Sequence, residues 1–149
     1  MILKHFIFII ITAMLINCGS KSVHLEEDLT PNFIKAMKFF DKGKYARAKD
    51  EFEYIIMTDP GSKLANESQY YKGESLFQMK EYDNAWVTFD RYVRFSNDIS
   101  KIEQSRYRIC ECTINLTNSF QRDQKHTKRA LEQLQMFIED FPQSELVQD

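Results

Sequence analysis

The strongest constraint on the fold is one pattern that occurs three times after residue 30. In each copy an alanine is followed four, seven and eight residues later by large apolar side chains. The copies begin at Ala48, Ala85 and Ala130. Offsets of this kind place the four side chains on one face of an α-helix. Each copy therefore predicts an amphipathic helix, and the repetition predicts an all-α chain built from similar units.

A second set of positions repeats upstream of the first. Small residues recur at intervals of 37 residues, at Ala36, Gly73 and Cys110. Aromatic residues stand three residues before the first two alanines, at Tyr45 and Tyr82. A small side chain at a fixed place lets a paired helix approach closely, so each copy predicts a hairpin of two helices. Such hairpins bury their apolar faces only when about three of them stack.

These spacings resemble the tetratricopeptide repeat, with its small residue, aromatic, alanine and terminal proline. The resemblance implies a solenoid of three helical hairpins over residues 30–149, with repeats at about 30–62, 63–99 and 100–144. We expect helices at about residues 31–42, 46–58, 63–79, 83–95, 101–117 and 125–140. Thr30 before Pro31, and Ser100 three residues before Glu103, predict helix starts at these places.

The third copy departs from the first two in length. Ala130 follows Cys110 by 20 positions, whereas the corresponding offset is 12 positions in the first two copies. We assign the additional residues to a loop at 118–124. Pro142 ends the last helix, and the residues after it begin a fourth unit, as in the N-terminal part of a longer array.

The first residues have the features of a secretory signal peptide. Lys4 precedes an apolar run of eleven residues, Phe6 to Ile16, which is too short for a bilayer core that needs roughly 20. The run ends in Leu15-Ile16-Asn17-Cys18, which resembles the lipobox of bacterial lipoproteins. The predicted organisation is a signal peptide at 1–17 and a lipidated tether at 18–29. An ordinary cleavable signal with an incidental cysteine is the alternative.

The lipobox resemblance implies a covalent anchor and no other cofactor. Cys18 would carry a diacylglyceryl group and an N-acyl chain, and several acyl chains hold a protein on a membrane almost permanently. Gly19 and Ser20 follow the cysteine in place of an aspartate, which favours the outer membrane over the inner one. We therefore expect the chain to be lipid-anchored on the periplasmic face of the outer membrane.

The mature chain also resembles one family in particular, the outer-membrane protein assembly lipoproteins of the BamD type. Besides Cys18, the similarity lies in residues 41–45 (DKGKY), 67–75 (ESQYYKGES), 107–112 (YRICEC), 122–124 (RDQ) and 142–145 (PQSE). The resemblance implies a non-catalytic scaffold of the β-barrel assembly machine. Its implied partners are the BamA-type barrel assembly subunit, other assembly lipoproteins and the C-terminal segments of unfolded outer-membrane proteins.

A peptide groove is the expected binding site. First helices of tetratricopeptide repeats line the concave face, and Tyr70 and Glu74 are in register with Tyr107 and Glu111, 37 residues further on. An aromatic groove suits the alternating side chains of a terminal barrel strand. The expected lining residues are Phe33, Met37, Phe40, Tyr70, Glu74, Phe77, Tyr107 and Glu111. The alternative is that the two tyrosines pack between helices and the glutamates are solvated.

Other functions receive less support from the residues. Net charge is −2 with no basic stripe, so nucleic acid is a poor candidate partner. Cys110 and Cys112 are expected to be small core residues, and no metal-binding or enzymatic motif occurs. Phe33 and Met37 stand where a chaperone-type carboxylate clamp needs polar residues. Another periplasmic tetratricopeptide lipoprotein, such as a pilus pilotin or an envelope-division coordinator, remains the alternative function.

Overall fold

The computed structural model describes residues 28–119 and 124–147, and these residues form helices with no strand. The helices are α2 (Thr30–Asp41), α3 (Tyr45–Thr58), α4 (Lys63–Gln78), α5 (Tyr82–Phe95), α6 (Ile99–Ser119), α7 (Gln124–Asp140) and the short 3₁₀ helix η2 (Glu145–Val147). The all-α fold predicted from the sequence is confirmed, and each long helix begins and ends within two residues of its predicted limits. Cys18 and the residues assigned to the signal peptide lie outside the described residues.

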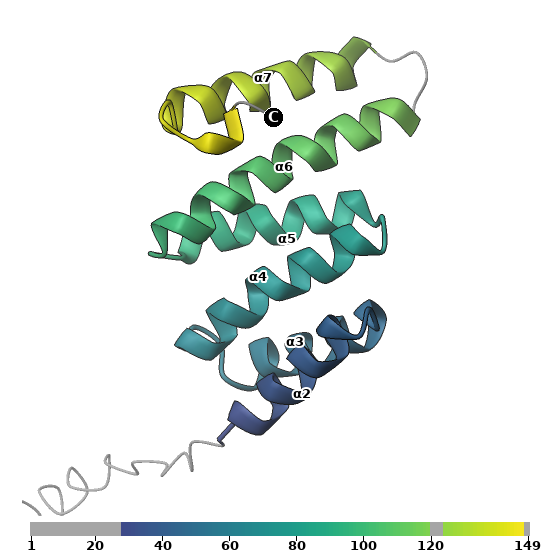
Figure 1. The fold of residues 1–149 in the computed structure, drawn as a ribbon, viewed down its shortest axis with the longest axis vertical. Coiled ribbons are helices and arrows are strands. Elements are labelled where there is room, and N and C mark those ends of the chain that lie inside the picture. Colours follow the sequence, from purple (N-terminus) through teal and green to yellow (C-terminus); the bar gives the residue numbers. More distant parts are fainter. Residues whose placement is uncertain (1–27, 120–123, 148–149) are drawn as a thin grey trace, which may run out of the picture.

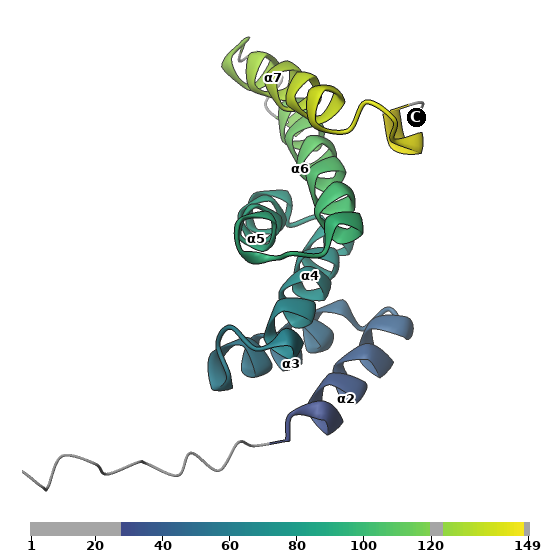
Figure 2. The same ribbon diagram turned by 90° about the vertical axis from the view of Figure 1, so that its left-hand side faces the viewer.

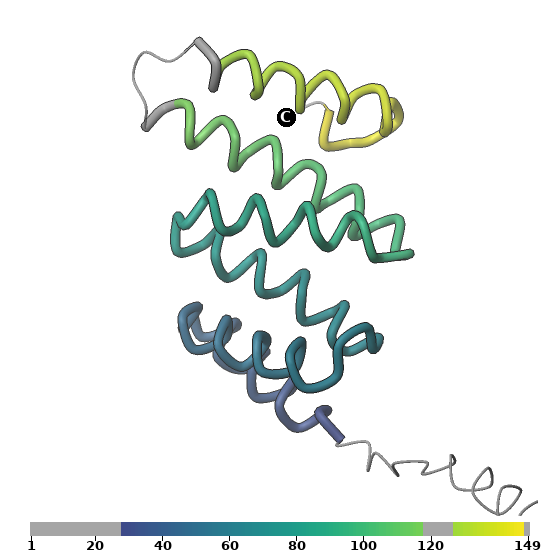
Figure 3. Tube along the Cα trace, turned by 180° about the vertical axis from the view of Figure 1, so that it is seen from behind, coloured from purple at the N-terminus to yellow at the C-terminus, as the bar shows by residue number. Residues whose placement is uncertain are grey.

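The helices form a stack in which each one packs against its neighbours in sequence. Figure 1 shows the stack from α2 to α7, and Figure 3 shows from behind how successive helices reverse direction. In addition, α4 contacts both α2 and α6 directly. The first helices of the three hairpins, α2, α4 and α6, therefore form one row, with α5 on the other side of it (Figure 2). We call α2, α4 and α6 the first-helix row, and the second helices of the hairpins, α3, α5 and α7, the second-helix row.

The repeated small positions lie where the two helices of each hairpin meet. Ala48 and Ala85 are fully buried, and Ala130 is 7% exposed. At Gly73 an added Cβ atom would lie only 2.7 Å from the nearest ring carbon of Phe89, closer than such atoms normally approach. The glycine therefore lets α4 and α5 pack around a large aromatic ring.

The core is divided between the hairpins. One cluster, around Ala36, Ala48 and Phe52, joins α2 to α3. A larger cluster joins α4, α5 and α6 and includes Leu76, Phe89 and Ile109. Its members also include Cys112, and both Cys110 and Cys112 are free, buried thiols, as the sequence predicted. Burial raises the pKa of Cys110 to about 11 and that of Cys112 to about 12, so both thiols stay protonated near neutral pH.

The helix starts differ from the predicted caps. The backbone N–H of Lys101 donates to the Asp98 carboxylate at 3.1 Å, and α6 begins at Ile99. Ser100 therefore lies inside the helix, and its predicted capping role is wrong. The carboxylate of Asp98 is the stronger acceptor for the free N–H groups of the first turn. At the start of α2, Leu29 takes the cap position and Thr30 is the first helical residue.

Candidate peptide-binding face

The predicted groove residues all lie on the first-helix row, on α2, α4 and α6. Three polar contacts join α4 to α6, and two of them involve the predicted residues Tyr70 and Glu74. Glu67 pairs with Lys101, the Tyr70 hydroxyl donates to Gln104 Oε1 at 2.8 Å, and Arg108 Nε donates to Glu74 Oε1 at 2.9 Å. The partners are 34 residues apart in every case. We call this set of contacts the polar ladder.

Arg108 is the centre of the polar ladder. It forms a bidentate pair with Glu74, in which the second contact, from Nη2 to Oε2, measures 3.2 Å. Its Nη1 donates to Glu111 Oε2 at 2.7 Å, and its guanidinium lies 4.7 Å from the centre of the Phe77 ring. Burial works to lower the pKa of Arg108, but hydrogen bonds and charge from the two glutamates outweigh it and raise the pKa. The Arg108 guanidinium is therefore already paired with two carboxylates of the protein itself.

Tyr70 and Glu74 lie in the interior and not on the surface of a groove. Tyr70 is 8% exposed and Glu74 is 6% exposed. Burial, and next the charge of Glu74, raises the pKa of Tyr70, so its hydroxyl stays a hydrogen-bond donor. The structure thus differs from both sequence interpretations, since Tyr70 packs between helices but Glu74 is not solvated. Neither side chain offers much area to a ligand while the helices keep this packing.

The residues on α2 gather around an aromatic residue that the sequence did not single out. The centre of the Tyr71 ring lies 6.1 Å from the ring centre of Phe33, 5.6 Å from that of Phe40 and 5.7 Å from that of Phe52. Met37 packs against the same cluster. Phe33, Met37 and Phe40 are half-buried, so one part of each side chain packs on the core and the rest faces solvent.

Tyr107 lies apart from the other tyrosine with which it was aligned. Its ring packs 5.9 Å from that of Phe137, which belongs to α7. The predicted residues therefore fall into three groups. Tyr70, Glu74, Phe77 and Glu111 lie together around Arg108 and its neighbours. The α2 residues form a separate aromatic cluster, and Tyr107 lies where α6 packs against α7. Phe77, Tyr107 and Glu111 are half-buried.

Sequence reasoning missed the α6 side of the polar ladder. Lys101, Gln104 and Arg108 stand 34 residues after their partners, whereas the alignment of the repeats is 37 residues. The sequence did contain a signal for these contacts, because two pairs of oppositely charged residues, Glu67 with Lys101 and Glu74 with Arg108, have this shorter spacing. The described residues contain no group of three or more His, Cys, Asp or Glu side chains that could hold a metal ion.

The exposed part of the first-helix row thus combines half-buried aromatic side chains on α2 and α4 with carboxylates and hydrogen-bonded amides on α6. Such a face can hold an extended peptide by apolar contact and by hydrogen bonds at its edge. None of the helices formed by the described residues is both long and apolar enough to cross a membrane.

Stacked helical hairpins with small residues at fixed positions define a helical-repeat protein of the tetratricopeptide type. Residues 27–149 match the family model described as YfiO, outer membrane lipoprotein. The match covers most of the chain, and the protein belongs to this family, which is the family of BamD. None of the curated proteins matches the chain. The family is one of scaffold lipoproteins, in agreement with the resemblance noted from the sequence.

Proposed function

We propose that the chain is a non-catalytic scaffold in the assembly of outer-membrane β-barrel proteins. The family match over residues 27–149 is the observation that carries this proposal. In this function the first-helix row binds C-terminal segments of unfolded barrel proteins, and other surfaces bind a BamA-type barrel subunit and further assembly lipoproteins.

The shape of the first-helix row supports peptide binding. Phe33, Met37 and Phe40 on α2, and Phe77 on α4, are anchored in the core by part of each side chain and open to solvent by the rest. Aromatic side chains fixed in this way lose little conformational entropy when a ligand covers them. A terminal barrel strand carries alternating aromatic residues that such a surface can accept.

The peptide hypothesis can be tested with one variant on the first-helix row and one control elsewhere. Phe77 lies on the first-helix row, whereas Leu131 is 63% exposed on α7, the second helix of the third hairpin. Phe77→Ala should weaken binding of a short peptide with alternating tyrosines and a C-terminal phenylalanine by about tenfold, which corresponds to about 1.4 kcal/mol. Leu131→Ala should leave it unchanged. The measurement is fluorescence anisotropy with a scrambled peptide as control and with the melting temperature of each variant recorded.

Equal affinity of the wild type and a folded Phe77→Ala variant would contradict the assignment of this face. The wider proposal is tested by co-purification of the full chain from solubilised envelopes. Recovery of a large barrel protein with periplasmic domains is expected, and recovery of pilus or division proteins in its place would refute the assembly function.

The membrane anchor is a separate part of the proposal and rests on Cys18, which lies outside the described residues. We propose that this cysteine carries the acyl chains that hold the protein on the outer membrane. Cys18→Ala should abolish incorporation of labelled palmitate and release the protein from the membrane fraction. A variant that still incorporates the label would exclude Cys18 as the acylation site.

A further inference from the structure

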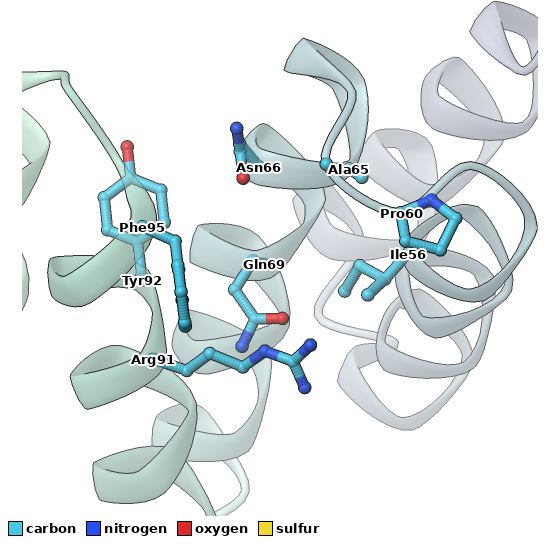
Figure 4. A pocket seen from close by; sticks show the side chains of 9 residues that line it. Ile56, Pro60, Ala65, Asn66, Gln69, Arg91, Tyr92 and Phe95 are labelled. Carbon is cyan, nitrogen blue, oxygen red and sulfur yellow. The ribbon is translucent and has the colours of Figure 1, made fainter.

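A groove opens between α3 and α5, the second helices of the first two hairpins, and residues of α4 form its floor. It consists of two adjoining hollows of about 360 and 350 Å³. The hollows share Ile56, Pro60, Gln69 and Arg91, so they form one continuous groove. Figure 4 shows the larger hollow, with Ile56 and Pro60 on one side and Tyr92 and Phe95 on the other. We call it the α3–α5 groove.

The walls of the groove carry large apolar side chains that the fold leaves uncovered. Met57 on α3 is 74% exposed, Val87 on α5 is 61% exposed and Phe95 is 69% exposed. Single exposed apolar residues are ordinary in soluble proteins. Here Met57 and Val87 border the smaller hollow and Phe95 borders the larger one, so an extended ligand that occupies both hollows could cover all three.

The floor of the groove presents a fixed hydrogen-bond acceptor. Gln69 is 9% exposed, and its side-chain Nε2 donates a hydrogen bond to the Thr88 carbonyl at 3.0 Å. This bond fixes the orientation of the amide. Figure 4 shows the Gln69 carbonyl oxygen directed into the hollow, toward the side of Ile56. A backbone N–H of an extended peptide could donate to this oxygen.

Arg91 places a positive charge in the groove that has no ion-pair partner among the described residues. Its side chain extends from α5 across the groove below Gln69 (Figure 4). Neighbouring cations are paired, since Lys72 contacts Glu53 at 3.0 Å and Arg94 contacts Asp90 at 2.8 Å. Among the described residues, Arg91 makes no hydrogen bond or ion pair. The groove lining carries Glu53, Lys72 and Arg91, one negative and two positive charges, which leaves a net charge of +1 at Arg91.

We propose that the α3–α5 groove binds an extended acidic and apolar segment of a partner protein. A carboxylate of the segment pairs with Arg91, because a guanidinium binds a carboxylate with two parallel hydrogen bonds. Apolar side chains next to that carboxylate cover Phe95 on one side and Met57 and Val87 on the other. A membrane surface fits less well, because recognition of anionic lipids typically needs clusters of about four to eight basic residues.

This inference does not depend on peptide binding by the first-helix row, because the groove lining includes none of the residues assigned to that face. The test uses the full chain, purified in detergent, and an array of short immobilised peptides. Each peptide carries a central glutamate flanked by combinations of leucine, isoleucine, phenylalanine and methionine. Every member is matched by the same peptide with glutamine at the centre.

We expect a subset of the glutamate peptides to bind the wild type about tenfold more tightly than their glutamine partners, equivalent to about 1.4 kcal/mol. Arg91→Gln should abolish this preference. Arg94→Gln is the matched control on the same helix and should retain it. Val87→Ser should weaken binding of all the peptides, because it removes an apolar side chain from the wall without adding a charge.

Several results would overturn the proposal. Binding by no member of the array, or equal binding of glutamate and glutamine peptides, would exclude an acidic ligand. A preference that survives Arg91→Gln in a variant with wild-type melting temperature would exclude Arg91 as its receptor. Binding of anionic phosphatidylglycerol vesicles that depends on Arg91, without any selective peptide, would show that the surface recognises lipid. Val87→Ser provides an independent test if Arg91→Gln does not fold, because unchanged peptide binding by that variant would exclude this groove as the binding site.

Discussion

The pairing of Arg108 with Glu74 should contribute more to stability than any other charge pair that we can compare with it. Arg108→Met retains most of the aliphatic bulk next to Phe77 but removes the guanidinium. Glu74, which is 6% exposed, would then be a buried carboxylate without its cation. Loss of one partner from a fully buried pair typically costs about 3 to 5 kcal/mol. Because the Arg108 side chain is 29% exposed, water can replace part of the contact, and we expect a cost of about 2 to 3 kcal/mol.

A double-mutant cycle separates the pair from its surroundings. Glu74→Gln keeps the shape of the side chain and an acceptor oxygen, so it should cost about 1 kcal/mol. In the double variant no buried charge remains unpaired, and the total should be about 2 kcal/mol, less than the sum of the single changes. The coupling energy between the two residues should therefore be about 1 to 2 kcal/mol.

The measurement is urea unfolding followed by far-ultraviolet circular dichroism near neutral pH. Arg94 and Asp90 provide the matched control, since they form an i, i+4 pair at 2.8 Å in which the arginine side chain is 67% exposed. Arg94→Met with Asp90→Asn should show a coupling below about 0.5 kcal/mol. If Arg108→Met costs no more than Arg94→Met, or if the Arg108 and Glu74 changes are additive, the polar ladder does not stabilise the stack as argued.

Three further predictions concern the core and the helix starts. Gly73→Ala should destabilise the fold by about 1 to 2 kcal/mol in thermal unfolding, because overpacking against Phe89 outweighs the better helix propensity of alanine; full stability would refute this close approach. Stability should fall as the pH rises above about 9, since Cys110 and Cys112 have raised pKa values in the fold and ionise first in the unfolded chain. Replacing both with alanine should move the onset of this loss in a pH titration to higher pH, and an unchanged onset would exclude the thiols. Ser62→Ala should cost about 1 kcal/mol in urea unfolding, because the serine accepts a hydrogen bond from the Ala65 N–H at 3.0 Å; no change would show that this cap is dispensable.

The helices could be predicted because the repeated alanines and apolar positions report a local property, the period of the α-helix. The same positions also report the hairpin contacts, since Ala48 and Ala85 are fully buried between paired helices. The caps were harder to predict, because Ser100 and Asp98 both occur near the start of α6. Their choice depends on where the preceding loop places each side chain, and the sequence pattern does not contain that information.

The candidate site was only partly predictable for a geometrical reason. Alignment of the repeats identifies equivalent positions, such as Tyr70 and Tyr107, but equivalent positions need not touch. In the stack, a residue of α4 meets the residue 34 positions later on α6, about one turn short of its equivalent. Tyr70 therefore contacts Gln104, while Tyr107 is left to pack against Phe137 on α7. Burial of Glu74 follows from the same offset, since it depends on Arg108.

The two joints between first helices differ in chemistry, and the difference affects how firmly each joint fixes its alignment. Aromatic rings connect α2 to α4, and such contacts tolerate small shifts because any apolar neighbour can replace another. The α4–α6 joint has specific partners. A slip of one turn that brings together residues 38 apart would move Glu67 from Lys101 to Ser105, and Glu74 from Arg108 to Cys112. Both carboxylates would lose their cations, at a cost that the apolar contacts cannot offset. We infer that the polar ladder sets the position of the third hairpin on the second.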